Sequence, residues 1–170
     1  TLTFSMSPTL AAPPSRENAR APGCHSELAY CFCGGGVSGI GQGNGVIDGG
    51  AHTDTLNLTD GANGNLLNAT YNGSSLTALS GNGLSNLETI NANMGGGTDW
   101  LIYAAASAAV IVNLGTSSAS GFASIAGIER VIGGNGDDNL TGDNLDNRLE
   151  GGVGADTLSG AGGIDAIFGG

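Results

Sequence analysis

The fold of this chain is set by residues 133–170, which read GGNGDDNLT GDNLDNRLE GGVGADTLS GAGGIDAIF GG when divided into frames of nine. In the first and third frames, which begin at Gly133 and Gly151, glycine stands at places one, two and four, aspartate at place six and an apolar residue at place eight. The second frame, from Gly142, and the fourth, from Gly160, keep part of this pattern. The stretch therefore predicts one structural unit that is repeated along the chain.

Each frame combines a turn with a short strand. Glycine permits positive φ and close backbone approach, so the first six places predict a turn that aims carbonyl groups inward beside one carboxylate. The last three places are too short for a helix and suit a β-strand whose middle residue faces a core. These predicted core residues are Leu140, Leu149, Leu158 and Ile167. Two frames then make one coil of a parallel β-solenoid, and the predicted fold class is all-β.

Turns two frames apart lie on the same edge of such a solenoid, which places Asp138 above Asp156 and Asn147 above Asp165. Stacked strands lie about 4.8 Å apart. Two carboxylates at that separation repel by roughly 0.9 kcal/mol in water and by about 3.5 kcal/mol at an effective dielectric constant of about 20. A cation between the turns removes this repulsion, and a flexible, carbonyl-rich set of oxygen ligands favours Ca²⁺ over Mg²⁺. The spacing therefore predicts calcium as the cofactor.

These frames resemble the calcium-binding repeats of the RTX (repeats-in-toxin) proteins, which carry the same nonapeptide. The resemblance implies a right-handed parallel β-roll in which each Ca²⁺ lies between two stacked turns. It implies a first ligand set of Gly134, Gly136 and Asp138 with Gly151, Val153 and Asp156. On the opposite edge it implies a second set of Asp143, Leu145 and Asn147 with Gly160, Gly162 and Asp165. The second set departs from the family pattern, because Asn147 brings no charge. The alternative for both sets is a glycine-rich solenoid with solvated Asp turns and no ion.

Composition favours a secreted protein that attracts cations. Of 170 residues 33 are glycine and only 5% are aromatic, so a large globular core is not expected. The net charge is −11, with 15 acidic residues, four arginines and no lysine. Nucleic acid and anionic membranes both require a basic face, so neither is an expected partner. The acidity also fits a simpler role, which is to keep a secreted protein soluble.

The expected location is extracellular, either secreted or at the cell surface. No apolar run reaches the ~18 residues that span a bilayer. The expected partners are calcium ions, and contact with a cell surface or a glycan through the parent protein stays open. The chain begins without Met and stops inside a repeat, which predicts a piece of a longer protein with a truncated roll.

Two further segments precede the repeats. Residues 1–33 contain all four prolines and predict a linker or disordered lead-in. Cys24, Cys31 and Cys33 lie close together there, and unpaired thiols, one disulfide and a zinc site with His25 all stay open. Residues 34–132 predict degenerate β-solenoid repeats with spacers.

Within residues 34–132, a related segment returns after about 40 residues, which predicts enlarged coils of the same solenoid. The expected strands are Leu56 to Leu58, Leu76 to Leu79, Leu101 to Tyr103 and Val110 to Leu114. Asp54 and Asp99 stand in isolated glycine turns and are weaker candidates for calcium ligands. Trp100 and Tyr103 are interpreted as core or surface cover rather than as a carbohydrate platform. Glu88 and Glu129 are interpreted as hydrogen-bond acceptors for a turn.

No catalytic motif appears in the chain. It lacks the His-Glu-x-x-His of a zinc protease and the Gly-x-Ser-x-Gly of a lipase. The first hypothesis is therefore a non-catalytic, calcium-folded segment of a secreted bacterial RTX-type protein, for which the resemblance implies type I secretion. The alternatives are a spacer or adhesive segment of a surface adhesin or S-layer protein, and the accessory repeat region of an extracellular hydrolase or epimerase.

Overall fold

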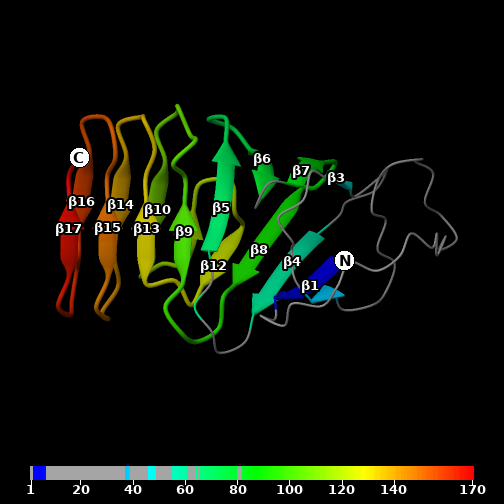
Figure 1. Cartoon of the computed structure of the whole chain (residues 1–170), viewed down its shortest axis with the longest axis horizontal. Helices are drawn as coiled ribbons and strands as arrows, with labels where there is room; N and C mark the ends of the chain where they lie inside the picture. The colour runs from blue at the N-terminus through cyan, green and yellow to red at the C-terminus, as the bar shows by residue number, and fades with distance from the viewer. Residues whose placement is uncertain are drawn as a thin grey trace, which may run out of the picture.

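The protein is all-β. The structure, a computed structural model, describes residues 2–6, 37–38, 46–48, 55–60, 64, 66–79 and 82–170. No helix occurs among these residues, and their strands form three sheets, of which one is purely parallel and two are mixed (Figure 1).

The strands are short, and each sheet draws them from distant parts of the chain. The five-stranded sheet has the order β12 (Ser124–Ala126), β8 (Thr89–Asn93), β4 (Thr55–Asp60), β1 (Leu2–Met6) and β2 (Val37–Ser38). The four-stranded sheet has the order β11 (Ser118–Ala119), β10 (Ile111–Asn113), β14 (Asn139–Thr141) and β16 (Thr157–Ser159). The eight-stranded sheet has the order β17 (Ala166–Phe168), β15 (Arg148–Glu150), β13 (Arg130–Ile132), β9 (Trp100–Ile102), β5 (Leu66–Tyr71), β6 (Leu76–Leu79), β7 (Asn82–Ser85) and β3 (Val46–Asp48).

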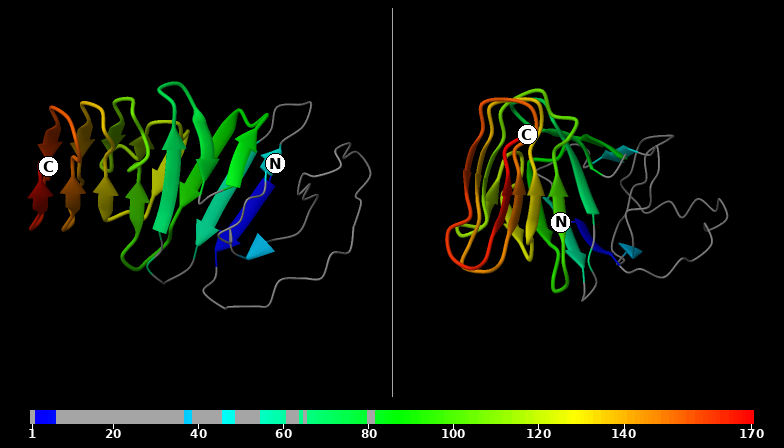
Figure 2. Two further views of the ribbon diagram at one scale, coloured as in Figure 1. Left: turned by 45° about the horizontal axis from the view of Figure 1, so that its top comes forward. Right: turned by 60° about the vertical axis from the view of Figure 1, so that its left-hand side comes forward.

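The last five strands alternate between two layers. Strands β13, β15 and β17 lie in one sheet and β14 and β16 in the other (Figure 1). Arg130 pairs with Arg148 and Asn139 with Thr157, so parallel neighbours lie two frames apart in the sequence. Two nine-residue frames therefore make one coil, as predicted, and the coils lie over one another in the right-hand view of Figure 2.

Coils nearer the N-terminus are larger. Leu66 pairs with Trp100 and Ile111 pairs with Asn139, and in both pairs the partners lie more than three but fewer than four frames apart. The coils are therefore enlarged, as predicted, although these two close in fewer residues than the predicted repeat of about 40. The extra residues form antiparallel excursions, β5 with β6 and β10 with β11, which leave and rejoin the layers. Such local pairings carry no nine-residue signature in the sequence.

The expected strands occur close to their predicted positions, as β4, β6, β9 and β10. The expectation of a disordered lead-in over 1–33 is wrong for Leu2–Met6, which forms β1 and pairs in parallel with β2 and β4. Alternating Leu2, Phe4 and Met6 give this segment a strand pattern that its proline-rich continuation obscures. The three cysteines and His25 lie outside the described residues.

A narrow apolar core runs between the layers. The middle residues of β13, β14 and β15, which are Val131, Leu140 and Leu149, are fully buried, because a three-residue strand points only its central side chain inward. The predicted core residue Leu158 is only partly buried, and Ile167 is 47% exposed. The core prediction is therefore wrong for Ile167, because β17 has a neighbouring strand on one side only.

Replacing a buried place-eight residue should therefore cost much more stability than replacing an exposed one. Leu149→Ala should lower the free energy of unfolding by about 3 kcal/mol, because it leaves a cavity in the core. The matched variant Ile167→Ala should lower it by less than about 1 kcal/mol. Urea denaturation followed by circular dichroism measures both, and equal losses would contradict this assignment of the core.

Candidate metal centre

The glycine turns lie along two edges of the stacked coils. Edge A carries the turn 133–138, between β13 and β14, and the turn 151–156, between β15 and β16. Edge B carries the turn 142–147, between β14 and β15, and the turn 160–165, between β16 and β17. Turns on one edge lie two frames apart in the sequence, which brings equal places of alternate frames together as predicted.

On edge A the place-six aspartates connect each turn to the one before it. Asp138, which is 1% exposed, accepts the backbone N–H of Val110 at Oδ1 (2.8 Å) and that of Gly134 at Oδ2 (2.6 Å). One coil later, Asp156 accepts the N–H of Asp138 at Oδ1 (2.8 Å). The Asp138 carboxylate is thus buried between coils, whereas Asp156 is half-buried.

Glycine carbonyl groups face the narrow gap between the two edge A turns. A methyl group on Gly152 would collide with the carbonyl oxygen of Gly134, and one on Gly154 with that of Gly136. A methyl group on Gly133 would collide with the carbonyl oxygen of Gly151 and with Oδ2 of Asp138. The gap therefore has room for glycine only, and three of the predicted carbonyl ligands border it.

Two other predicted features of edge A can also be located. Val153 lies in the second turn and donates its N–H to the carbonyl oxygen of Gly134 (3.0 Å), an oxygen that retains a second lone pair. Oδ2 of Asp156 is buried and accepts no hydrogen bond, although Oδ1 of the same group does. A buried carboxylate oxygen without a protein donor is satisfied by a water molecule or by a cation. The donor set of edge A therefore fits a hard cation.

Edge B differs at its central residue. Asn147 is buried, donates its backbone N–H to Oδ1 of Asp165 (2.9 Å) and accepts the N–H of Asp143 at its own Oδ1 (2.7 Å). This arrangement matches that of Asp138, except that an amide Nδ2 replaces the second carboxylate oxygen, and it makes no hydrogen bond. An amide nitrogen cannot accept an N–H or ligate a cation. The backbone of edge B follows the pattern of edge A. The set of oxygen atoms that could ligate a cation differs, because the place-six side chains of edge B have one oxygen fewer.

The remaining members of the second predicted set border edge B. Asp143 offers its carbonyl oxygen to the N–H of Gly162 (2.9 Å), and the carbonyl oxygen of Leu145 abuts Gly163. Gly160 lies under the Asp165 side chain, where a methyl group would collide with Oδ2. The structure therefore brings this set together, with Asn147 as its uncharged member.

A second row of aspartates was missed by the sequence reasoning. Asp137 accepts the N–H of Ala155 at Oδ1 (2.9 Å), and Asp146 accepts the N–H of Ile164 (2.7 Å), in each case one coil further on. Both occupy place five, where the nonapeptide pattern allows any residue. Their recurrence at the same place of adjacent frames was the signal that could have revealed them.

The isolated Asp turns have different outcomes. Asp54 lies outside the described residues. Asp99 is fully buried, and its N–H donates to Oε2 of Glu129 (2.8 Å), while its carbonyl oxygen accepts the N–H of Arg130 (3.0 Å). Glu129 is thus a hydrogen-bond acceptor for a turn, as predicted.

Among the described residues, no three His, Cys, Asp or Glu side chains gather into a cluster, so carbonyl groups must supply most ligands of any ion.

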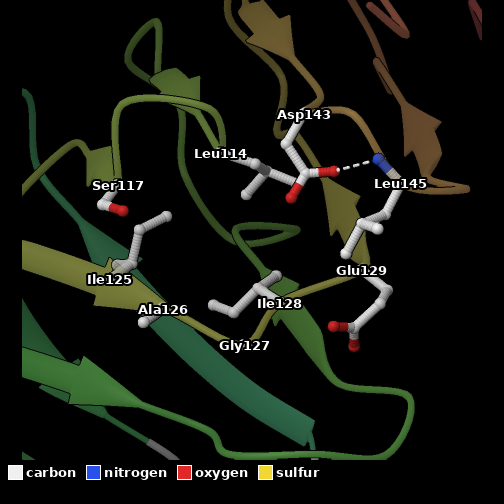
Figure 3. A pocket seen from close by; sticks show the side chains of 9 residues that line it. All are labelled: Leu114, Ser117, Ile125, Ala126, Gly127, Ile128, Glu129, Asp143 and Leu145. Carbon is white, nitrogen blue, oxygen red and sulfur yellow. Dashed lines mark hydrogen bonds between the residues drawn. The ribbon is translucent and has the colours of Figure 1, made fainter. Parts of the chain in front are cut away.

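A cavity of about 170 Å³ opens on edge B between the loop that follows β10 and the turn 142–147 (Figure 3). Leu114, Ile125 and Ile128 form its apolar wall, with Glu129 and Asp143 at its margin. Both carboxylates already accept a backbone N–H, Asp143 from Leu145 (2.8 Å) and Glu129 from Asp99. These two side chains are therefore turn caps.

Comparison with known proteins finds no family model, no curated protein and no solved structure that matches this chain. Within the described part of the chain, no helix is long and apolar enough to cross a membrane.

Glycine at place one of edge A should be indispensable where the turns are stacked. Gly151→Ala should lower the free energy of unfolding by about 2 kcal/mol, because the added methyl group meets Oδ2 of Asp156. Gly169→Ala is the matched control, since a methyl group at this place-one glycine meets nothing within 4 Å. Urea denaturation should show a change below about 0.5 kcal/mol for the control. A similar loss in both variants would mean that the turns are not stacked as described.

Proposed function

We propose that residues 133–170 form a calcium-binding parallel β-roll of the RTX type, and that the chain is a non-catalytic, calcium-folded segment of a secreted bacterial protein. The observation that carries this proposal is the buried Oδ2 of Asp156, which has no hydrogen-bond partner in the protein and lies beside Gly151, next to the carbonyl oxygen of Gly169. The match of the frames to the RTX nonapeptide supports it independently.

The residues that would hold the ion are those of edge A. Asp138 and Asp156 contribute carboxylates, and Gly134, Gly136, Gly151 and Val153 contribute carbonyl groups. Ca²⁺ accepts six to eight oxygen ligands in flexible geometry, whereas Mg²⁺ demands a near-ideal octahedron. A gap formed by glycine backbone and two carboxylates suits the larger ion. When bound, calcium supplies the positive charge that two stacked carboxylates require.

This arrangement couples ion binding to folding. Both carboxylates of the site come from turns that meet only when coils are stacked, so the unfolded chain has no preformed site and the binding free energy adds to stability. At low calcium inside a cell the acidic chain stays extended, and outside the cell millimolar calcium drives stacking. The proposed location is therefore extracellular, and export through a type I pathway agrees with the RTX resemblance.

A spacer in a surface adhesin or S-layer protein is the second candidate. It is favoured by the hydrogen bonds that already join the coils, since Asp138, Asp137 and Asp146 each accept one backbone N–H from another coil. A solenoid held in this way needs less ion. An accessory role beside the catalytic domain of an extracellular hydrolase or epimerase is compatible with either candidate, and the described residues suggest no reaction of their own.

Calcium titration tests the proposal directly. Far-ultraviolet circular dichroism should show a cooperative rise in β-structure with Ca²⁺, in the micromolar to millimolar range, and not with Mg²⁺. Asp138→Ala and Asp156→Ala should each weaken the response at least tenfold, because each removes a charged ligand of the stacked site. Asp54→Ala, in an isolated turn, is the matched control and should change it little. Equal effects of all three substitutions would overturn the edge A site, and full β-structure without calcium would favour the spacer.

Restoring the missing carboxylate should create a site on edge B. Asn147→Asp should add one calcium ion to the stoichiometry measured by isothermal titration calorimetry, because the new Oδ2 replaces a buried amide nitrogen that cannot ligate a cation. The variant should lose stability in chelator, since it adds a buried negative charge. Asp146→Asn, which changes the adjacent place-five residue, should leave the stoichiometry unchanged.

A further inference from the structure

The outward face of the eight-stranded sheet gathers both arginines of the described residues in one row. Parallel register places Arg130 between Trp100 and Arg148, on adjacent strands. Val131 and Leu149 point into the core, so the flanking arginines point away from it. The whole chain has a net charge of −11, with four arginines and no lysine, whereas this face carries local positive charge.

Aromatic rings hold the two guanidinium groups. Cζ of Arg130 lies 4.9 Å from the centroid of the Trp100 ring, and Cζ of Arg148 lies 5.9 Å from the same ring. Arg148 also lies over Phe168, with its Cζ at 4.2 Å from that ring. Cation–π contacts of this kind fix the position of a guanidinium group without using its N–H donors.

Most of the hydrogen-bonding capacity of this cluster is unused. Arg148 donates from Nε to Oε1 of Glu150 (2.6 Å), which leaves its terminal nitrogens open. The guanidinium of Arg130 meets no hydrogen-bond acceptor among the described residues. Like charges on directly adjacent strands are destabilising, and one glutamate neutralises only half of this pair. Two rigid, half-exposed guanidinium forks therefore face solvent with open donors, which is the geometry that binds carboxylates in a bidentate manner.

We propose that this guanidinium patch, formed by Trp100, Arg130, Arg148, Glu150 and Phe168, binds a carboxylate-bearing polysaccharide, that is, a chain of uronic acid units. The patch is independent of the proposed calcium site, because it lies on the sheet face and not on the turn edges. The positive charge of the patch favours an anionic partner. Because the patch contains only two guanidinium groups, it favours a polymer whose negative charges are widely spaced.

Other anionic polymers fit this face less well. Nucleic acid and anionic membranes present dense charge, which a chain of net charge −11 with two half-exposed guanidinium groups repels. A peptide must find partners for its backbone N–H and C=O groups, and those of a sheet interior are already paired within the sheet. A polyuronate brings one carboxylate per sugar, leaves its hydroxyl groups in water and can lay its apolar C–H faces on Ile102, Ile132 and Phe168, which flank the arginines.

The chain contains a reporter for this interaction. Trp100 is its only tryptophan and contacts both arginines. Titration of the full chain with tetragalacturonate should therefore change the tryptophan fluorescence in a saturable way, and calorimetry should give the same dissociation constant. The fully methyl-esterified tetramer, which has the same sugars without charge, should not bind. Arg130→Gln should weaken binding roughly tenfold, the loss of about one charge-assisted pair.

Matched variants separate the patch from general charge. Arg20→Gln changes the net charge by the same amount as Arg130→Gln and should leave binding unchanged, whereas Arg130→Lys keeps the charge, loses the fork and should bind more weakly than the wild type. Arg148→Gln replaces Arg130→Gln if circular dichroism shows that the latter does not fold. Titrations at fixed calcium and in chelator distinguish binding through the arginines from binding through calcium ions that bridge the protein and the uronate. The proposal is overturned if the methyl ester binds equally, if the arginine substitutions have no effect, or if phosphatidylglycerol vesicles or duplex DNA compete more strongly than the uronate tetramer.

Discussion

The stack of coils depends on one recurring hydrogen bond, in which the side chain at place six of a turn accepts the backbone N–H of the place-six residue one coil earlier. The pair Asp138 and Asp156 shows it on edge A, and Asn147 and Asp165 show it on edge B. The strands of these coils are only three residues long, so the strand ladders alone provide few hydrogen bonds between coils. Side chains in the turns extend the ladder around the edges, where the backbone bends and cannot continue it.

This constraint explains why the turns need glycine and why they suit a cation. A side chain that folds back over place one leaves no room for a methyl group there, as the close contact between Gly151 and Asp156 shows. The same folding stacks the place-six side chains of one edge over one another, and on edge A both of these side chains are carboxylates. Backbone N–H groups satisfy three of the four carboxylate oxygens of Asp138 and Asp156. The fourth has no protein donor, and a cation that filled this place would link the geometry of the turn to the proposed role of calcium.

The two proposed binding functions, for calcium and for an anionic polysaccharide, lie on different surfaces of the molecule. The two edges carry acidic turns, while the outward face of the eight-stranded sheet carries both described arginines over Trp100 and Phe168. Tyr103 belongs to neither surface. It is fully buried, donates its hydroxyl to the carbonyl oxygen of Ser120 (2.7 Å), and burial together with Tyr71 raises its pKa far above the usual value. It is a core residue, as predicted, whereas Trp100 covers the surface beneath the guanidinium groups.

The sequence by itself determined the repeat, the pairing of frames two apart and the residues that meet on each edge, because a fixed nine-residue period leaves one register in which glycines, aspartates and apolar residues all coincide. It also placed Asn147 as the weak member of edge B. Only the tertiary structure decided which carboxylate oxygens are satisfied, how far Ile167 is exposed, and that coils before residue 133 need more than three frames to close. These properties depend on contacts between coils and on antiparallel excursions with no sequence period. The arginine row shows the same limit: Arg130 and Arg148 stand two frames apart in the sequence, and only the parallel register of β13 and β15 makes them neighbours.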